Sequence, residues 1–398
     1  MVWKAMLAAA ACAAAMTARG ADAPTAQKTS EPPAGPRTVL ELPPGPGNPR
    51  NSEGDFARLK NGDVLYVYSR YDKGHGDDAD PASLASRVSR DGGRTWSAED
   101  VEVVPNEGKL NVMSVSLLRM GDGSLGLFYL RKNSGADCRP VMRRSRDEGR
   151  TWSAPQLCVP DSEIGFYVLN NSRVVRLSSG RIVLPLCWHT PKGGDAFDGA
   201  GLLTCVVSDD DGATWRRAGA PFATTAADGR RVTTQEPGVV ELKDGRALMF
   251  ARTTEGRQWS WISADGCATW TDGGPWTLAG PCSPATVKRL SGGELVAVWN
   301  DHETHPEYAK QGPAWARGAR RPLTIALSRD EGRTWSPRRT VEDVPKGWYC
   351  YTALLELDGN LLLGYCAEKM LCHSRVTLVP LAWLRGGGTP VNSPPPGP

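Results

Sequence analysis

The sequence lacks an excess of charge of one sign, a cysteine pair with zinc spacing and an apolar run of membrane length. Lysine and arginine total 47 against 44 aspartate and glutamate residues, a formal net charge of +3 over 398 residues. This balance argues against a partner such as nucleic acid. No cysteine belongs to a Cys-x-x-Cys pair, and the apolar run Met6–Met16 is too short to span a bilayer.

The two ends of the chain differ from the rest. Lys4 precedes the apolar run Met6–Met16, and small residues follow around Gly20–Ala23, a pattern typical of an export signal. We expect a signal peptide over residues 1–23, a linker over 24–37, and a secreted or periplasmic mature protein. The end, residues 387–398, is rich in proline and is expected to be a disordered tail.

The nine cysteines beyond the signal are odd in number and scattered singly along the chain. This distribution indicates buried small hydrophobic residues rather than a disulfide framework. One bridge remains open.

One short motif recurs five times. The nonapeptide SRDEGRTWS occurs at 145–153 and again at 328–336, and three more segments share its pattern Ser-x-Asp-x-Gly-x-Thr-Trp. The five copies begin at Ser89, Ser145, Ser208, Ser263 and Ser328, and Cys267 takes the glycine place in the fourth. We interpret each as a turn in which Asp accepts backbone N–H bonds, Gly adopts positive φ and Trp packs between sheets. A calcium loop is excluded because the final glutamate is missing.

Six apolar runs around tight turns lie between these motifs and predict β-hairpins. They are Phe56–Arg70, Val115–Arg131, Val174–His189, Val239–Arg252, Ala285–Asp301 and Ala353–Cys366. We call the repeated motif an Asp box and the four strands of a blade A to D in chain order. Six hairpins and five Asp boxes predict an all-β fold: a six-bladed β-propeller of four-stranded antiparallel blades over residues 38–386, with each box joining strands C and D. The sixth blade lacks a box. Its remaining strands are expected to include Thr377–Leu384 and a strand near Val39–Leu42 that closes the ring.

In an antiparallel hairpin the start of strand A and the end of strand B lie at the same end, so in all six blades they lie on the same face of the propeller. That face collects arginines, carboxylates and tyrosines, which predicts a binding or catalytic site there. The charged or tyrosine candidates include Glu53, Arg70, Glu236, Arg252 and Tyr351 on the hairpins. Asp77, Asp78 and Asp80 lie in a loop, and Arg320 and Arg321 are expected at the start of the third strand of the fifth blade.

Asp boxes on six such blades resemble the sialidase (neuraminidase) superfamily over nearly the whole mature chain. The resemblance implies an exo-glycosidase that hydrolyses a terminal sialic-acid-like sugar from a glycoconjugate, without a metal or organic cofactor. A tyrosine nucleophile suits this reaction because a carboxylate on the anomeric carbon repels an anionic nucleophile. The expected partner is a glycan, with no nucleic acid and no membrane span, and the expected state is a monomer.

The resemblance also suggests roles for individual residues. Tyr351-Thr-Ala-Leu resembles the family's Tyr-Ser-x-Leu segment and makes Tyr351 the expected nucleophile. Glu236 and Arg252 match the glutamate partner of that tyrosine and one arginine of a carboxylate-binding cluster.

Arg321 matches a second arginine of that cluster, and the adjacent Arg320 is its alternative. Asp77 has the spacing of the acid/base, with Asp78 and Asp80 as competitors; Arg70 and Asp78 are expected to bind substrate.

The first blade departs from the family pattern. Ser52 stands where the family has an arginine, and Glu53 adds a carboxylate beside it. Arg50, two residues earlier, is the alternative source of the missing positive charge. Two arginines with an extra carboxylate would suit another acidic sugar, so an Asp-box hydrolase or lyase on another acidic glycan is one alternative. A non-catalytic glycan-binding propeller is the other, and a long distance between Tyr351 and Glu236 would favour it.

Overall fold

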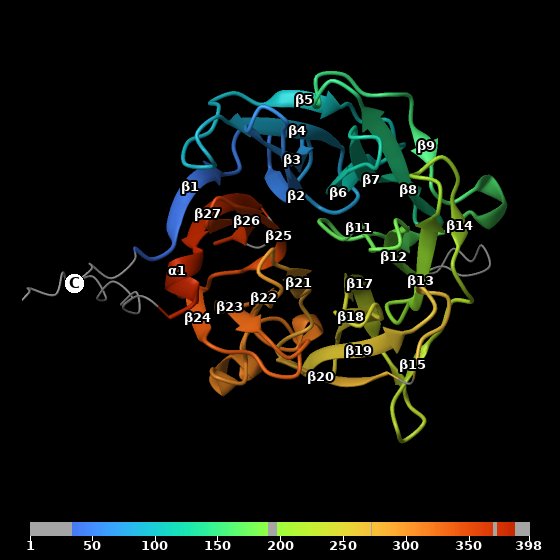
Figure 1. Cartoon of the computed structure of the whole chain (residues 1–398), viewed down its shortest axis with the longest axis vertical. Coiled ribbons are helices and arrows are strands. Elements are labelled where there is room, and N and C mark those ends of the chain that lie inside the picture. Colours follow the sequence, from blue (N-terminus) through green and yellow to red (C-terminus); the bar gives the residue numbers. More distant parts are fainter. Residues whose placement is uncertain (1–33, 190–196, 272, 369–371, 387–398) are drawn as a thin grey trace, which may run out of the picture. The chain divides into compact units, whose positions relative to one another are not determined.

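The computed structural model describes residues 34–189, 197–271, 273–368 and 372–386. Within them, strands dominate and form antiparallel sheets that follow one another around a central axis, as Figure 1 shows. The predicted signal peptide (1–23), most of the predicted linker (24–37) and the predicted tail (387–398) lie outside the described residues. The six-bladed β-propeller predicted from the hairpins and boxes is confirmed.

Blades 1, 2 and 3 run in chain order from the N-terminal side. Blade 1 contains β2 (Arg50–Arg58), β3 (Val64–Tyr71), β4 (Ala82–Ser89) and β5 (Val101–Val104). Blade 2 contains β6 (Asn111–Arg119), β7 (Leu125–Ser134), β8 (Asp137–Ser145) and β9 (Gln156–Leu157). Blade 3 contains β10 (Tyr167–Val168), β11 (Val175–Arg176), β12 (Ile182–Trp188), β13 (Leu202–Ser208) and β14 (Arg216–Arg217). Its first strand is interrupted, because β10 and β11 both pair with β12.

Blades 4, 5 and 6 complete the ring. A two-stranded hairpin, β15 (Thr224–Thr225) with β16 (Arg231–Val232), precedes blade 4, which contains β17 (Thr234–Glu241), β18 (Ala247–Thr253), β19 (Arg257–Ser263) and β20 (Gly274–Ala279). Blade 5 contains β21 (Thr286–Arg289), β22 (Leu295–Trp299), β23 (Leu323–Ser328) and β24 (Arg338–Glu342). Blade 6 contains β25 (Cys350–Leu357), β26 (Asn360–Ala367), β27 (His373–Pro380) and β1 (Arg37–Leu42).

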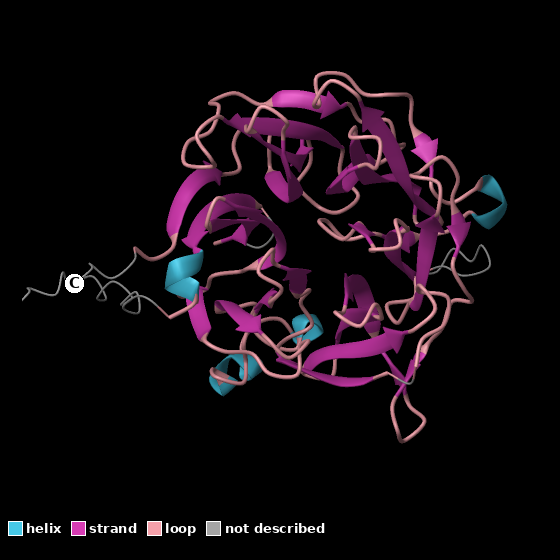
Figure 2. Cartoon of the chain, in the orientation of Figure 1, coloured by secondary structure: helices cyan, strands magenta, loops and turns pink. Residues whose placement is uncertain are grey.

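The ring closes through blade 6, where the N-terminal strand β1 pairs antiparallel with β27. The expected closing strand near Val39–Leu42 is therefore confirmed. The expected strand Thr377–Leu384 is corrected in its bounds: β27 ends at Pro380, and Leu381–Leu384 form the short helix α1. This turn buries Leu381, Trp383 and Leu384 in the core shared by blades 5 and 6, which an extended segment would not do. Other helix among the described residues is limited to 3-10 turns at Asp161–Glu163, Pro306–Lys310 and Ala314–Ala316 (Figure 2).

Each Asp box begins at the last residue of a third strand, as expected for a turn between strands C and D. In the second box, Asp147 Oδ1 accepts a bond from the Thr151 N–H at 2.9 Å and Oδ2 one from its hydroxyl at 2.6 Å. The Thr151 hydroxyl bond is the main cause that lowers the pKa of Asp147 to about 2. The box tryptophans pack between blades; Trp215 of blade 3 lies edge-on to Phe128 of blade 2 at 5.8 Å. Cys267 keeps the glycine conformation with φ 75°.

Candidate functional site

Four of the first strands begin with a β-bulge that aims one side chain toward the axis. Glu53, Ser114, Glu236 and Tyr351 have φ values of 54°, 62°, 52° and 57°, and the strand register slips at each of these positions. A left-handed conformation costs a residue with a side chain about 1–2 kcal/mol. Bulges re-aim side chains next to active sites. Here the four strained residues are brought together in the lining of one cavity.

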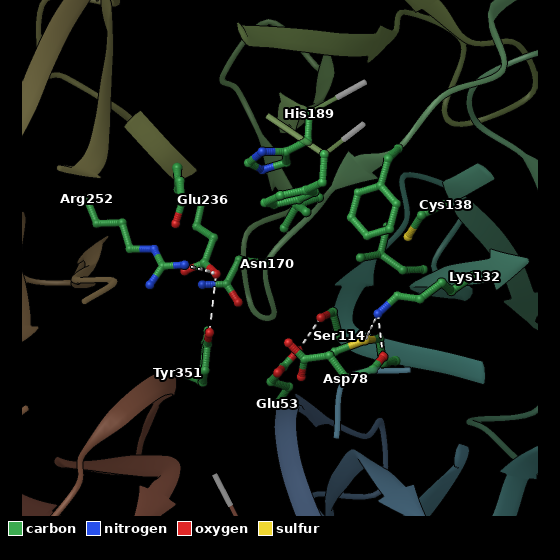
Figure 3. Close-up of a pocket in the computed structure, with 16 residues that line it drawn as sticks. Glu53, Asp78, Ser114, Lys132, Cys138, Asn170, His189, Glu236, Arg252 and Tyr351 are labelled. Atoms are coloured by element: carbon green, nitrogen blue, oxygen red, sulfur yellow. Dashed lines mark hydrogen bonds and ion pairs between the residues drawn. The ribbon is translucent and has the colours of Figure 1, made fainter. Parts of the chain in front are cut away.

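The cavity has a volume of about 180 Å³ and is drawn in Figure 3. Tyr351, Glu236 and Arg252 lie on one side, Lys132 and Cys138 lie on the other, and Glu53, Asp78 and Ser114 lie between them. Charges of both signs therefore surround one small space.

Tyr351 and Glu236, which the sequence places on different blades, are in contact. The Tyr351 hydroxyl donates to Glu236 Oε1 at 3.2 Å, and Arg252 Nη2 donates to the same oxygen at 2.8 Å. Burial, and then the Glu236 carboxylate, raise the pKa of Tyr351 well above its usual value. Glu236 Oε2 and Arg252 Nε are buried without a hydrogen-bond partner in the described part of the chain. The phenol thus has a carboxylate placed to accept its proton.

Arg320, not Arg321, joins this group. Arg320 Nη2 and Arg252 Nη1 both donate to the Cys282 carbonyl, at 3.1 and 3.3 Å, and the Arg320 guanidinium lies 5.7 Å from the centre of the Tyr351 ring. Arg320 is 1% exposed, yet its Nε and Nη1 find no oxygen acceptor within the described residues. The Arg321 side chain instead pairs with Asp343 at 2.6 Å. Neither arginine is among the residues that line the cavity, so Arg320 belongs to the group through its contacts with Cys282 and Tyr351.

Arg50 lies buried behind the first-blade residues and connects two carboxylates. Its Nη2 donates to Glu53 at 2.8 Å, its Nη1 to Asp78 at 2.6 Å and its Nε to the Ser52 hydroxyl at 2.9 Å. The other Glu53 oxygen accepts a bond from Ser114. Arg50 therefore pairs with both Glu53 and Asp78, and it is absent from the cavity lining.

The three neighbouring aspartates have different positions. Asp78 lines the cavity, and although desolvation opposes its ionisation, Arg50 and then Lys132 lower its pKa. Asp80 closes its own loop, since its Oδ2 accepts the N–H groups of His75, Gly76 and Asp77 at 2.8 to 2.9 Å. Asp77 is exposed and does not line the cavity. Asp78 is therefore the aspartate that can reach a bound ligand.

Arg70 also lies apart from the cavity, because it pairs with Asp72 and with Asp100. Sequence reasoning missed Lys132, whose ammonium donates to the Asp78 carbonyl at 2.5 Å, and the aromatic wall of Phe166 and Phe197. Lys132 directly follows Arg131, which ends the predicted hairpin, so strand alternation could have indicated it. The two phenylalanines come from loops that carry no such signal.

Asn171 ties the strained bulges across the axis. Its Nδ2 donates to the carbonyls of Gly54 at 2.8 Å and Tyr351 at 2.9 Å. These bonds connect the interrupted strand of blade 3 with blades 1 and 6. They help to hold the Tyr351 bulge in place.

Comparison with known proteins agrees with this architecture. The chain is 25% identical over 365 residues to a sialidase of Micromonospora viridifaciens, covering 84% of this chain and 52% of that protein. It is 28% identical over 275 residues to the anhydrosialidase of Macrobdella decora, covering 64% of this chain and 33% of that protein. The chain thus spans about half or less of the length of these relatives. A structure of a Dyadobacter fermentans protein of unknown function superposes with a TM-score of 0.66 at 17% identity, covering 87% of this chain and 99% of the other.

The fold and its five Asp boxes define an Asp-box propeller of the sialidase superfamily. A family model described as a BNR repeat-like domain matches residues 67–363, more than half of the chain. The chain belongs to that family. Among the described residues, no helix combines the length and apolar character needed to cross a bilayer.

Proposed function

We propose that the chain is a retaining exo-glycosidase that removes a terminal acidic sugar from a glycan. Tyr351 is the nucleophile, Glu236 accepts its proton, and Asp78 is the acid/base. Arg252 and Arg320 bind the anionic group of the sugar. We further propose that the protein acts after export, as the predicted signal peptide suggests.

The contact between Tyr351 and Glu236 carries this proposal. A phenol held 3.2 Å from a buried carboxylate can lose its proton to that carboxylate as it attacks the anomeric carbon. The arrangement joins two blades and needs a strained conformation at both residues. Strained residues cluster at active sites and ligand clamps, and the contact between a phenol and a carboxylate favours an active site.

Two arginines with N–H groups that lack an oxygen acceptor support the proposal that the sugar is anionic. Arg252 Nε and Arg320 Nε and Nη1 are buried without an oxygen acceptor in the described part of the chain. Buried N–H donors that lack partners are costly. A carboxylate bound between the two guanidinium groups would supply the missing acceptors.

The reaction then follows in two steps. Tyr351 Oη bonds to the anomeric carbon as the bond to the leaving oxygen breaks, and Asp78 gives that oxygen a proton. Asp78 next takes a proton from water, which attacks the anomeric carbon and releases Tyr351. Two displacements retain the anomeric configuration.

Replacing Tyr351 tests the proposal. Tyr351→Phe should lower kcat on an aryl sialoside, or on the aryl glycoside of another acidic sugar that the wild type cleaves, at least about a thousandfold. Affinity for the free sugar acid, measured by calorimetry, should change little because one hydroxyl is lost. Tyr308→Phe is the matched control, since Tyr308 does not line the cavity. A wild type that binds an acidic sugar but cleaves no such glycoside would instead identify a binding propeller.

A further inference from the structure

Two cysteines face each other across the hairpin that carries Tyr351. Cys350 of β25 and Cys366 of β26 are direct partners in the antiparallel register. Directly opposed residues of antiparallel strands have Cα atoms about 4.5 to 5.5 Å apart, within the range of about 4.4 to 6.8 Å that a disulfide requires. In the structure both are free, buried thiols. The backbone therefore already has the spacing of a covalent bridge.

The pair lies directly behind groups of the cavity. Cys350 and Cys366 are 2% and 0% exposed, and they pack with Ala316 and Trp348 against Tyr351. Cys350 immediately precedes Tyr351, and the bulge that gives Tyr351 its φ of 57° starts at this register pair. A bond between the two sulfurs would tie the start of the bulge to the next strand.

We infer that Cys350 and Cys366 form a cross-strand disulfide when the protein folds in the presence of a disulfide oxidant. The Cys350 thiolate attacks one sulfur of the oxidant disulfide and releases one thiol. The Cys366 thiolate then attacks the Cys350 sulfur of the mixed disulfide and releases the second thiol. The two cysteines lose two electrons and two protons, and the oxidant disulfide becomes two thiols. Because both sulfurs are buried in the folded chain, the bond forms before the blades pack and is then shielded from reductants.

The effect on the cavity rests on the proposed function. The bond restrains the residue before Tyr351, so it preorganises the nucleophile and lowers the cost of holding the bulge. Turnover of the oxidised protein should exceed that of the Cys366→Ser variant about two- to tenfold, with KM nearly unchanged. Cys158→Ser is the matched control, because Cys158 is also buried.

Peptide mapping tests the bond without any assay of activity. Trypsin should release residues 347–369 as one peptide, since no lysine or arginine lies between Lys346 and Lys369, and this peptide contains Cys350 and Cys366 and no other cysteine. The full chain, refolded with oxidised and reduced glutathione, is unfolded in excess alkylating agent and digested. We expect this peptide to be unalkylated and lighter than its dithiol form by two hydrogen atoms. Prior reduction should add two alkyl groups.

A peptide alkylated on both cysteines without reduction would overturn the inference. A bond from either cysteine to a different one would overturn it as well. If the bond forms but no glycoside is cleaved, the inference stands and the proposed function fails.

Discussion

Asp77 and Asp78 are adjacent residues of the same type, yet they have different surroundings. The loop that carries them is closed by Asp80, whose carboxylate collects three backbone N–H groups. Both side chains are exposed, but only Asp78 lines the cavity and pairs with Arg50. The position of the proposed acid/base therefore depends on a turn two residues further along the chain.

The pH dependence of turnover should reflect the ionisation of the Asp78 carboxylate. Its lowered pKa means that Asp78 is largely ionised near neutral pH, and the protonated fraction falls about tenfold for each pH unit above the pKa. For a glycoside with an alkyl leaving group, which needs the proton, kcat/KM should fall as pH rises from 4 to 7. An aryl glycoside with a good leaving group should show a much weaker fall. Rate profiles of both substrates against pH would check this.

Asp78→Asn should separate the same two substrates. Losing a general acid costs about 10²- to 10⁴-fold, so the variant should lose turnover of the alkyl glycoside and keep most cleavage of the aryl glycoside. Asp77→Asn is the matched control and should behave as the wild type. The opposite result, with loss at Asp77 and none at Asp78, would reassign the acid/base.

The sequence pointed to several of these residues, but at two positions it favoured the neighbour of the residue that lies at the site in the structure. It favoured Asp77 with Asp78 as a competitor, and Arg321 with Arg320 as its alternative. Tyr351, Glu236 and Arg252 begin or end hairpin strands, where side chains alternate between two faces, and the structure brings them together. Asp78 and Arg320 lie in loops or just before a strand, where alternation no longer applies. There a one-residue shift changes which side chain lies at the site: Asp78 lines the cavity, and Arg320 packs against the Tyr351 ring. Spacing alone cannot resolve such a shift, because it depends on bonds such as those to Asp80 and the pairing of Arg321 with Asp343.

At the scale of the blades, a carboxylate joins each of five successive pairs of neighbouring blades, on the face of the propeller that carries the Asp boxes. It accepts the backbone N–H of the A–B turn in the preceding blade. The acceptors are Glu148, Asp211, Glu241, Glu331 and Glu356, and the donors are Lys60, Gly121, Ser178, Lys243 and Ser291. The carboxylate comes from two different places. In three blades it belongs to the Asp box and is paired with an arginine of the first strand, whereas in two it is on the first strand itself.

In four of these blades, the residue that ends the first strand matches the source of the carboxylate. Arg119, Arg176 and Arg289 occur in blades whose box has an acid, Glu148, Asp211 or Glu331, after its aspartate. Blade 4 has Glu241 at the equivalent strand position, and its box has Gly266 instead of an acid. One blade therefore compensates a change in its strand by a change in its turn. This pairing is not visible from the box motif alone, because the position after the aspartate varies freely within the pattern.

Glu331→Gln tests the contribution of one such bond. Its carboxylate receives Arg289 at 2.6 Å and the Lys243 N–H at 2.9 Å. Removing the charge should lower the free energy of unfolding by about 1–2 kcal/mol. Glu255→Gln is the control, since Glu255 pairs with the half-exposed Arg230 and surface pairs contribute less than about 1 kcal/mol. Urea unfolding of both variants gives the comparison. Equal losses of unfolding free energy would show that the bonds between neighbouring blades are no stronger than surface pairs.

At the scale of the whole molecule, the propeller depends on joining the two ends of its chain. Strand β1 is the outer strand of a blade whose other strands come more than three hundred residues later. Backbone bonds and a cluster of charges fasten it to β27. Glu41 of β1 accepts bonds from His373 and from Arg375, the latter at 2.7 Å. Arg375 also pairs with Glu342 and Glu368, so this closure connects β1 with blades 5 and 6.

Glu41→Gln should weaken the closure in a pH-dependent way. Partial burial opposes ionisation, but the bonds from His373 and Arg375 lower the pKa of Glu41 below its ordinary value of 4.5. A carboxylate with a lowered pKa in the folded state contributes stability above its unfolded pKa and loses it as pH falls through the folded pKa. At pH 7 we expect the variant to be less stable by about 1 kcal/mol, because the group is partly exposed. Below pH 4.5 the difference should shrink progressively. Urea midpoints of wild type and variant from pH 3 to 7 would show this, with Glu102→Gln on the exposed strand β5 as the control, and a difference that stays constant down to pH 3 would contradict the ionic role of Glu41.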